Sequence, residues 1–362
     1  MGKLGISVFT GMEQSVLQNI EYLQLAASLG YHQLFTSLHI PEADYRTFIS
    51  DCRFLLKEAQ RLDFSVTADL SPRTRMLLGI EPADLRSWGI DTLRVDFGFS
   101  PVKIRELAEA SGLRIEVNAS VMQEAELNQL LAAGVDQKIL CAGHNYYPRP
   151  DTGLGFDLFA RRSQYFQAMK IPVSAFIPGI QHPRGPLYAG LPTVETHREM
   201  KPVEAARQLW ASGLVDTIVF GDPLVSGPDL MAVAALPQEM ANPLVFRVKA
   251  YELSAEEQEL VWASMHTNRN DAAGYVVRSQ ESREKYSVQM PPRSQPQMRR
   301  RGDVTIDNLR YGRYAGELQI LLQDLPADEK VNVVGRIIDE DLCLLDCLFP
   351  GRGFCLKEVV TR

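Results

Sequence analysis

Short apolar, β-branched runs alternate with longer segments of 3.6-residue periodicity over roughly the first 230 residues of the chain. Segments such as SVLQNIEYLQLAASLG and PVEAARQLWASG have the helical period, and several end at a glycine that suits a helix C-cap. The apolar runs predict eight strands, at residues 4–9, 32–37, 63–69, 91–97, 113–119, 136–142, 172–177 and 216–221.

Strand–helix alternation implies parallel strands joined by right-handed crossovers. Eight such units predict an α/β fold, a (β/α)8 TIM barrel, over residues 1–240. An open, doubly wound sheet is the alternative, but no glycine-rich dinucleotide fingerprint follows any of the predicted strands.

The pattern changes near LPQEMANPLVFRVKAYEL, where Pro237 and Pro243 mark a boundary, and a second domain is predicted over residues 243–362. It combines one amphipathic helix, SAEEQELVWASMH, with short strand-like segments, GYVVRSQ, DVTIDN, GELQILLQ, VNVVGRII and CLLDCLF. This composition predicts a small β-rich or α+β domain.

Charge, apolar runs and cysteine content indicate which partners, which location and which cysteine state to expect. The net charge of −7 argues against a protein that coats nucleic acid or an anionic membrane. The N-terminus lacks an export signal and no apolar run approaches the roughly 20 residues of a membrane span, which predicts a cytoplasmic chain. Five scattered cysteines indicate free thiols, and the Cys343–Cys347 spacing lacks the second ligand pair of a zinc site.

Polar side chains gather at the ends of the predicted strands, where the active site of such a barrel lies. With the two-residue period of a strand, Arg94 and Asp96 share one face, as do Glu116 and Asn118 on the next strand, and Asp69 joins them. Several buried like charges are costly unless they are paired, metal-bound or retained for function. The group therefore predicts acid–base chemistry, while a structural ion pair between Arg94 and Glu116 stays open as the alternative for Glu116.

Asp69, Asp96, Glu116, His39 and His144 could also assemble a metal site, but no HxH or HExxH motif supplies a local ligand set. No metal and no cofactor are therefore expected. A nucleophilic triad is not expected either, because no GxSxG elbow is present.

The segment CAGHNYYPRPDTGLG follows the sixth predicted strand and combines hydrogen-bonding groups with aromatic rings, as a sugar-binding loop does. The residues we expect to bind substrate are Ser37, Asn118, His144, Asn145, Tyr146, Arg149, Arg198, Arg278 and Arg301. The arginines among them suit an anionic group such as a phosphate, through charged hydrogen bonds.

Many blocks of the chain, in order, carry a family resemblance: LGISVFTG, LRVDFGF, IEVNAS, GHNYYPRPDTGL, VSAFIPG, GPLYAGLPTVETHR, RSQESR, RRGDVTIDN and GRYAGELQILLQDLPADEKVNVVGRI. From residue 4 to about residue 355, the chain resembles the MupG family of 6-phospho-N-acetylmuramidases. The resemblance implies a TIM barrel followed by a cyclophilin-like domain. It also implies hydrolysis of the β-1,4 bond between N-acetylmuramic acid 6-phosphate and N-acetylglucosamine, in cytoplasmic cell-wall turnover.

For this reaction, the positions at the strand ends predict Asp96 and Glu116 as the central catalytic carboxylates and Asp69 as a third. Asn118, His144, Asn145 and Tyr146 would orient the sugar. Neighbouring strands lie about 4.8 Å apart, nearer to the roughly 5 Å carboxyl separation of retaining glycosidases than to that of inverting ones, and a substrate-assisted route stays open.

The expected partner is the phosphorylated disaccharide, not nucleic acid or membrane, and a homodimer is one option for the assembly. Two other functions stay open. One is a non-catalytic sugar-phosphate sensor, and the other is a metal-dependent sugar-phosphate aldolase or isomerase.

Overall fold

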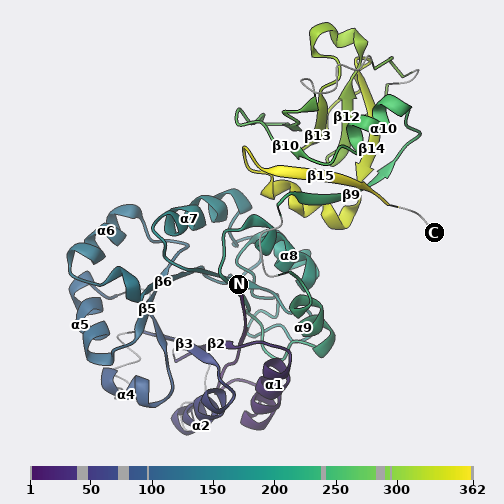
Figure 1. Cartoon of the computed structure of the whole chain (residues 1–362). Coiled ribbons are helices and arrows are strands. Elements are labelled where there is room, and N and C mark those ends of the chain that lie inside the picture. Colours follow the sequence, from purple (N-terminus) through teal and green to yellow (C-terminus); the bar gives the residue numbers. More distant parts are fainter. Residues whose placement is uncertain are drawn as a thin grey trace. The chain divides into compact units, whose positions relative to one another are not determined.

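The chain divides into two compact units, Met1–Glu239 and Met240–Arg362. A computed structural model describes residues 2–38, 48–71, 81–95, 98–237, 242–282, 290–293 and 296–359 (Figure 1). None of the helices within these ranges is both long and apolar enough to cross a lipid bilayer.

The first unit is a closed barrel in which each strand pairs in parallel with the next one along the chain, and β1 pairs with β8 to close the ring (Figure 1). Its strands are β1 (Lys3–Ser7), β2 (Gln33–Ser37), β3 (Ser65–Leu70), β4 (Thr92–Val95), β5 (Arg114–Asn118), β6 (Leu140–Gly143), β7 (Val173–Ile177) and β8 (Thr217–Phe220). The prediction of a TIM barrel is confirmed.

Helices surround the barrel on its outside (Figure 1). Those described are α1 (Val16–Ser28), α2 (Phe48–Arg61), α4 (Pro82–Ser87), α5 (Pro101–Ser111), α6 (Glu124–Ala132), α7 (Phe156–Ala168), α8 (Pro202–Ser212) and α9 (Gly227–Ala234), with short 3₁₀ turns η1 (Gln137–Ile139) and η2 (Glu195–Glu199). Their ends follow local chemistry: Ser15 forms a capping box with Gln18, and Gly112 ends α5 with a φ of 65°.

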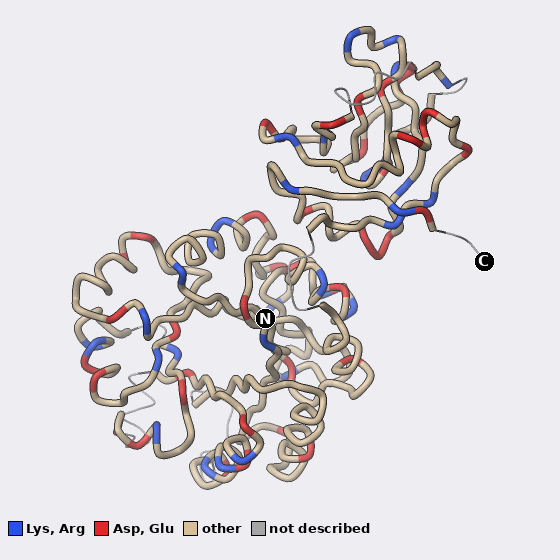
Figure 2. Tube along the Cα trace, in the orientation of Figure 1, with Lys and Arg blue, Asp and Glu red and all other residues tan. Residues whose placement is uncertain are grey.

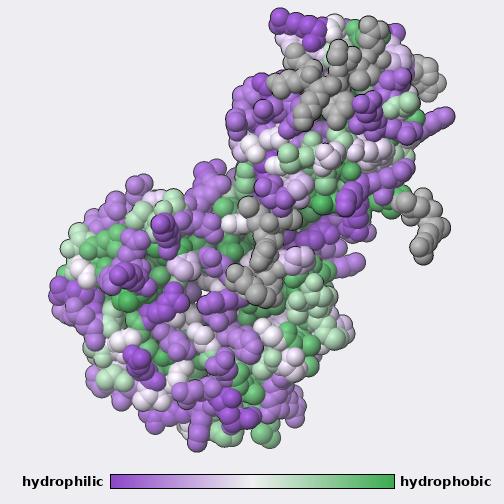
Figure 3. Space-filling view, in the orientation of Figure 1, coloured by the Kyte–Doolittle hydropathy of each residue, from purple (hydrophilic) through white to green (hydrophobic). Residues whose placement is uncertain are grey.

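The core of this unit lies between the strands and the helices. Strand residues that point outward, such as Val66, Leu93 and Ile115, are completely buried against the helices. Acidic and basic residues are spread over the outer helices in Figure 2, and the face drawn in Figure 3 mixes hydrophilic with hydrophobic residues. The apolar core therefore lies between the strands and the helices, and the inward-facing strand positions can be polar.

The second unit is a mixed sheet of order β10-β15-β9-β14-β12-β13-β11, in which β9 and β15 are parallel and the other pairs antiparallel. Its elements are β9 (Leu244–Ala250), α10 (Ala255–Val261), β10 (His266–Thr267), β11 (Val276–Arg278), β12 (Asp303–Asp307), η3 (Leu309–Tyr314), β13 (Leu318–Leu321), β14 (Val331–Ile337), η4 (Asp339–Cys347) and β15 (Gly353–Glu358).

The β-rich character predicted for this unit is confirmed, but CLLDCLF is not a strand. Most of it lies in η4, where Leu344, Leu345 and Cys347 are buried. The side chain of Asp341, earlier in η4, accepts hydrogen bonds from the backbone and the guanidinium of Arg247 on β9. An apolar run of this length fits a buried helical turn as well as a strand.

Candidate active site

Polar residues on four adjacent strands form one row inside the barrel. Ser37 of β2 is the register partner of Asp69 of β3, Asp69 that of Arg94 of β4, and Arg94 that of Glu116 of β5. Register partners point to the same side of a sheet, and Glu116 lines a cavity inside the barrel. The fold thus brings Ser37, Asp69 and Glu116 together, while Asp96 lies outside the described residues.

Arg94 and Glu116 form a buried ion pair within this row. Arg94 Nη1 lies 2.8 Å from Glu116 Oε1, and the two side chains are 5% and 8% exposed. The same Nη1 donates to the carbonyl of Gly143, and Glu116 Oε2 accepts from Ser174 Oγ at 3.3 Å. The structural alternative for Glu116 is therefore the one observed, which leaves this carboxylate engaged on both oxygens.

The ion pair fixes the orientation of Asn145. Arg94 Nη2 donates to Asn145 Oδ1 at 2.7 Å, and Asn118 Nδ2 donates to the same oxygen at 2.9 Å. A guanidinium can only donate, so the atom that faces it must be the amide oxygen, and Nδ2 occupies the other position. This Nδ2 makes no hydrogen bond within the described part of the chain, and Asn145 is only partly buried. Asn145 thus presents two N–H donors to a ligand.

His144 does not take the role predicted for it. The side chain is fully buried, with Nδ1 3.2 Å from Ser120 Oγ and Nε2 3.0 Å from Ser163 Oγ. Burial lowers the pKa of His144 to about 3, so the ring is neutral at physiological pH. Since both nitrogens are engaged, His144 cannot contact a sugar, and its contact with Ser120 instead supports the backbone of Asn145, whose N–H donates to the same hydroxyl.

Tyr146 and Arg184 form a second part of the site, next to aromatic residues near the carboxyl ends of the strands. The Tyr146 ring packs edge-on against Phe35 and Phe176, with centroids 6.0 and 5.2 Å away. Arg184 Nη1 donates to the Tyr146 hydroxyl at 3.0 Å, and its guanidinium lies 4.6 Å from the centroid of Phe9. Burial raises the pKa of Tyr146, and the charge of Asp69 raises it further, which places Asp69 in the same surroundings.

Sequence reasoning missed Arg184, because it lies in the loop after β7 rather than at a strand end. The signal that could have revealed it is the segment IPGIQHPRGPLYAG, in which a single arginine stands among prolines and glycines.

Asp222 is a loop anchor. It is completely buried at the end of β8, and its carboxylate accepts the backbone N–H groups of Gly179, Arg184 and Leu191 at 2.8 to 3.0 Å. Burial raises the pKa of Asp222, and these three hydrogen bonds lower it. The β7 loop that carries Arg184 is thereby pinned to the end of β8.

Arg198 is also a loop anchor, which corrects its predicted role as a substrate ligand. Its Nε and Nη2 bind the carboxylate of Glu195, and its remaining N–H groups donate to the carbonyls of Ala189, Gly190 and Tyr147. All five donors of a guanidinium are thus occupied. The pair also holds the preceding loop, since Glu195 accepts the backbone N–H groups of Asp151 and Gly153, and hydrogen bonds to Arg198 lower the pKa of Glu195 to about 2.

The structure also defines the surroundings of the remaining candidates. Asp69 is half-buried and its Oδ1 accepts the N–H of Leu38 at 3.1 Å, while Arg149 is exposed in the β6 loop. Arg278 and Arg301 lie in the second unit, where they pair with Glu317 and Asp346 respectively. The described residues contain no cluster of three or more His, Cys, Asp or Glu side chains that could hold a metal ion.

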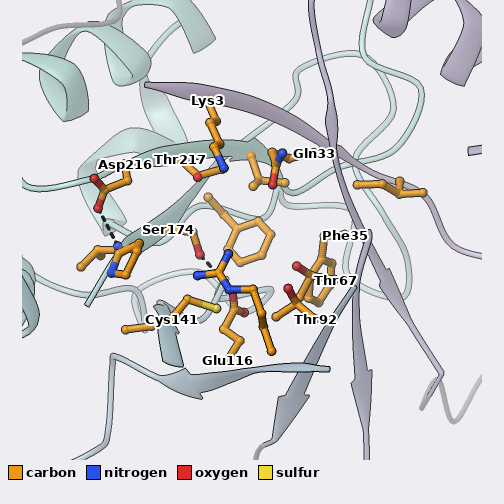
Figure 4. Close-up of a pocket in the computed structure, with 17 residues that line it drawn as sticks. Lys3, Gln33, Phe35, Thr67, Thr92, Glu116, Cys141, Ser174, Asp216 and Thr217 are labelled. Atoms are coloured by element: carbon orange, nitrogen blue, oxygen red, sulfur yellow. Dashed lines mark hydrogen bonds between the residues drawn. The ribbon is translucent and has the colours of Figure 1, made fainter. Parts of the chain in front are cut away.

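A cavity of about 210 Å³ with a mixed polar and apolar lining occupies the amino-terminal half of the barrel. Lys3, Gln33, Thr92, Ser174 and Thr217 line it together with Glu116 (Figure 4). It exists because most inward positions here carry small or polar side chains instead of the branched apolar residues that usually fill such barrels. The cavity lies on the side away from the strand-end loops, and the polar groups in its lining make the buried charge of Glu116 less costly.

Comparison with known families covers both units. Residues 4–235 match the family model described as 6-phospho-N-acetylmuramidase, N-terminal, and residues 244–357 match 6-phospho-N-acetylmuramidase, C-terminal. A search of curated proteins found no match.

Two solved structures are similar over nearly the whole chain. An uncharacterized B. cereus protein has 31% identity and a TM-score of 0.72, with 99% of each chain covered. A conserved Enterococcus faecalis protein of unknown function has 34% identity and a TM-score of 0.59, with 98% of this chain and 96% of that chain covered.

The Gly143→Ala variant tests the space that the ion pair needs. A Cβ at Gly143 would overlap the carboxylate of Glu116 and lie 2.6 Å from Arg94 Nη1. We expect a loss of about 1–3 kcal/mol in the free energy of unfolding, measured with urea. The control is Gly227→Ala at the start of α9, where a Cβ would meet only Leu25 at 3.9 Å and stability should be unchanged or slightly higher. Equal stability of wild type and Gly143→Ala would contradict the packing described.

Two buried histidines predict an acid-sensitive barrel. Burial lowers the pKa of His144 to about 3 and that of His197 to about 4, whereas an unfolded histidine titrates near 6.5. The unfolded state therefore binds more protons, so stability falls as pH drops below about 6.5. Each histidine should contribute about 2 kcal/mol of this loss by pH 5. Urea unfolding at pH 7.5 and at pH 5 measures this loss of stability. The His144→Asn variant should lose about half of the pH dependence. A wild-type stability that is the same at both pH values would refute the lowered pKa of the two histidines.

Proposed function

The chain belongs to the 6-phospho-N-acetylmuramidase family, and from this membership we propose that it hydrolyses N-acetylmuramic acid 6-phosphate linked β-1,4 to N-acetylglucosamine. The observation that carries the proposal is the group of Asp69, Asn145, Tyr146 and Arg184 at the carboxyl ends of the barrel strands, in a chain whose two units both match this family. A role in cytoplasmic recycling of cell-wall fragments is part of the proposal.

The reaction needs a proton for the leaving oxygen and a water molecule for the anomeric carbon. As the bond between C1 and the bridging oxygen breaks, an acid protonates that oxygen, and water supplies the hydroxyl of the new reducing end and returns its proton to the enzyme. We assign Asp69 to this proton chemistry because it stands in the inward-facing row between Ser37 and Arg94, at the carboxyl end of β3. Glu116 is paired with Arg94, and Asp222 binds the backbone of the β7 loop. Asp96 stays a prediction for the second carboxylate.

The other residues of the site would bind and orient the sugar. Asn145 Nδ2 is suited to donate to a carbonyl or hydroxyl oxygen, such as the acetamido oxygen, because its own oxygen is held by Arg94 and Asn118. Tyr146 offers a ring face held in place by Phe35 and Phe176. Donors that are fixed before the substrate arrives need no reorganisation during the reaction.

A cleavage assay tests the proposed function. Wild-type protein is incubated with the phosphorylated and the unphosphorylated disaccharide, and the products are identified by mass spectrometry. We expect release of N-acetylglucosamine from the phosphorylated compound at a clearly higher rate. Binding without cleavage would favour a sugar-phosphate sensor, and activity that a chelator abolishes would favour a metal-dependent enzyme.

The Asp69→Asn variant tests the assignment of the acid. Loss of a proton-transferring carboxylate should lower kcat by about 10²–10⁴-fold and leave KM within a few-fold. Asp63→Asn is the matched control, since Asp63 is exposed at the opposite end of β3 and its left-handed φ of 60° suits asparagine. Wild-type turnover in a folded Asp69→Asn protein would remove Asp69 from the mechanism.

A further inference from the structure

We propose that Arg184 is the residue that binds the phosphate group of the substrate and sets selectivity for the phosphorylated sugar. The inference rests on the proposed function and adds a residue that neither the strand-end pattern nor the family match assigns.

The position of Arg184 is the first observation. It lies in the loop between β7 and α8, and its guanidinium reaches the rings of Phe9 after β1 and Tyr146 after β6, 4.6 and 5.2 Å from their centroids. In TIM barrels, the loops that follow the seventh and eighth strands are frequent phosphate-binding elements. Arg184 therefore stands on the catalytic side of the barrel, between three strand ends.

The charge of Arg184 is the second observation. Arg94 is paired with Glu116 and Arg198 with Glu195, but no carboxylate forms an ion pair with Arg184 within the described ranges. The guanidinium is half-buried, and its contacts are the Tyr146 hydroxyl and the carbonyl of Gly185. Burial raises the pKa of Asp222 and the charge of Arg184 lowers it, but no described carboxylate contacts the guanidinium. A partly desolvated cation of this kind attracts an anion, because little solvent screens it.

The nearby carboxylate of Asp222 does not compensate this charge directly. Asp222 accepts the backbone N–H of Arg184 rather than its guanidinium, together with the N–H groups of Gly179 and Leu191. These three bonds position the loop, so that the arginine is held in place from its backbone.

The free donors of Arg184 match a phosphate. Nη2 makes no hydrogen bond within the described residues, and Nη1 uses one of its two protons on Tyr146. The planar guanidinium, which contacts the rings of Phe9 and Tyr146, can present parallel N–H groups to two phosphate oxygens. Lysine offers the same charge without this fork.

The experiment compares Arg184→Gln, Arg184→Lys and wild type on the phosphorylated and the unphosphorylated disaccharide. For Arg184→Gln we expect kcat/KM on the phosphorylated compound to fall about 10- to 100-fold more than kcat/KM on the unphosphorylated compound. Arg184→Lys should recover part of the loss. Arg61→Gln on α2, an exposed arginine paired with Glu58, is the matched control and should change neither rate.

An equal loss on both substrates would overturn the proposal, because it would indicate a packing role or a contact with another group of the sugar. Binding of N-acetylmuramic acid 6-phosphate and of inorganic phosphate, measured by calorimetry, gives a readout that needs no turnover. If wild type cleaves neither disaccharide, the proposed function fails. In that case, binding of N-acetylmuramic acid 6-phosphate that is at least tenfold weaker in Arg184→Gln, with a smaller loss in Arg184→Lys, would still support the assignment. Unchanged binding in Arg184→Gln would refute it.

Discussion

The buried ion pair between Arg94 and Glu116 is the interaction on which the rest of this site depends. Two charges inside a barrel are costly unless their remaining donors and acceptors are satisfied. Here Ser174 and the carbonyl of Gly143 complete the hydrogen bonding, and a partly polar cavity lies beside Glu116. The pair constrains its surroundings in turn, since residue 143 must be glycine-sized and the amide of Asn145 can face Arg94 only with its oxygen. The ion pair in the barrel interior thus orients the amide of Asn145, so that its Nδ2 points away from Arg94.

The loops above the barrel are fixed by the same means. Asp222 uses its carboxylate on three backbone N–H groups, and Arg198 uses all five of its donors on Glu195 and on the backbone of two loops. These buried charged residues are structural. Asn145 Nδ2 and Arg184 Nη2, by contrast, make no hydrogen bond within the described ranges. Buried charged groups in this part of the barrel can therefore be structural, as Asp222 and Arg198 are.

The sequence predicted the barrel well because strand–helix alternation is a local pattern that repeats eight times. The strand-end rule also predicts Asp69, Asn118, Asn145 and Tyr146 as site residues, and these stay predictions. The rule assigned His144 wrongly, although the two-residue period of a strand distinguishes His144 from Asn145. Asn145 shares the inward side with Gly143, whereas His144 points outward into the core. Arg184 could not be found this way, because its position depends on bonds from Asp222, more than thirty residues later in the chain. The pairing of Glu116 with Arg94 was foreseen only as an alternative, since sequence gives the face of a side chain but not its partner.

The most direct test of this account is the pH dependence of kcat/KM for the Glu116→Gln variant, measured at a temperature where the protein is folded. If Glu116 positions Arg94 and Asn145, the rate should fall while both limbs of the wild-type pH profile remain, since the groups that exchange protons with the substrate are still present. Loss of one limb in Glu116→Gln would show that Glu116 itself titrates in the reaction, and would contradict the structural role of the buried ion pair.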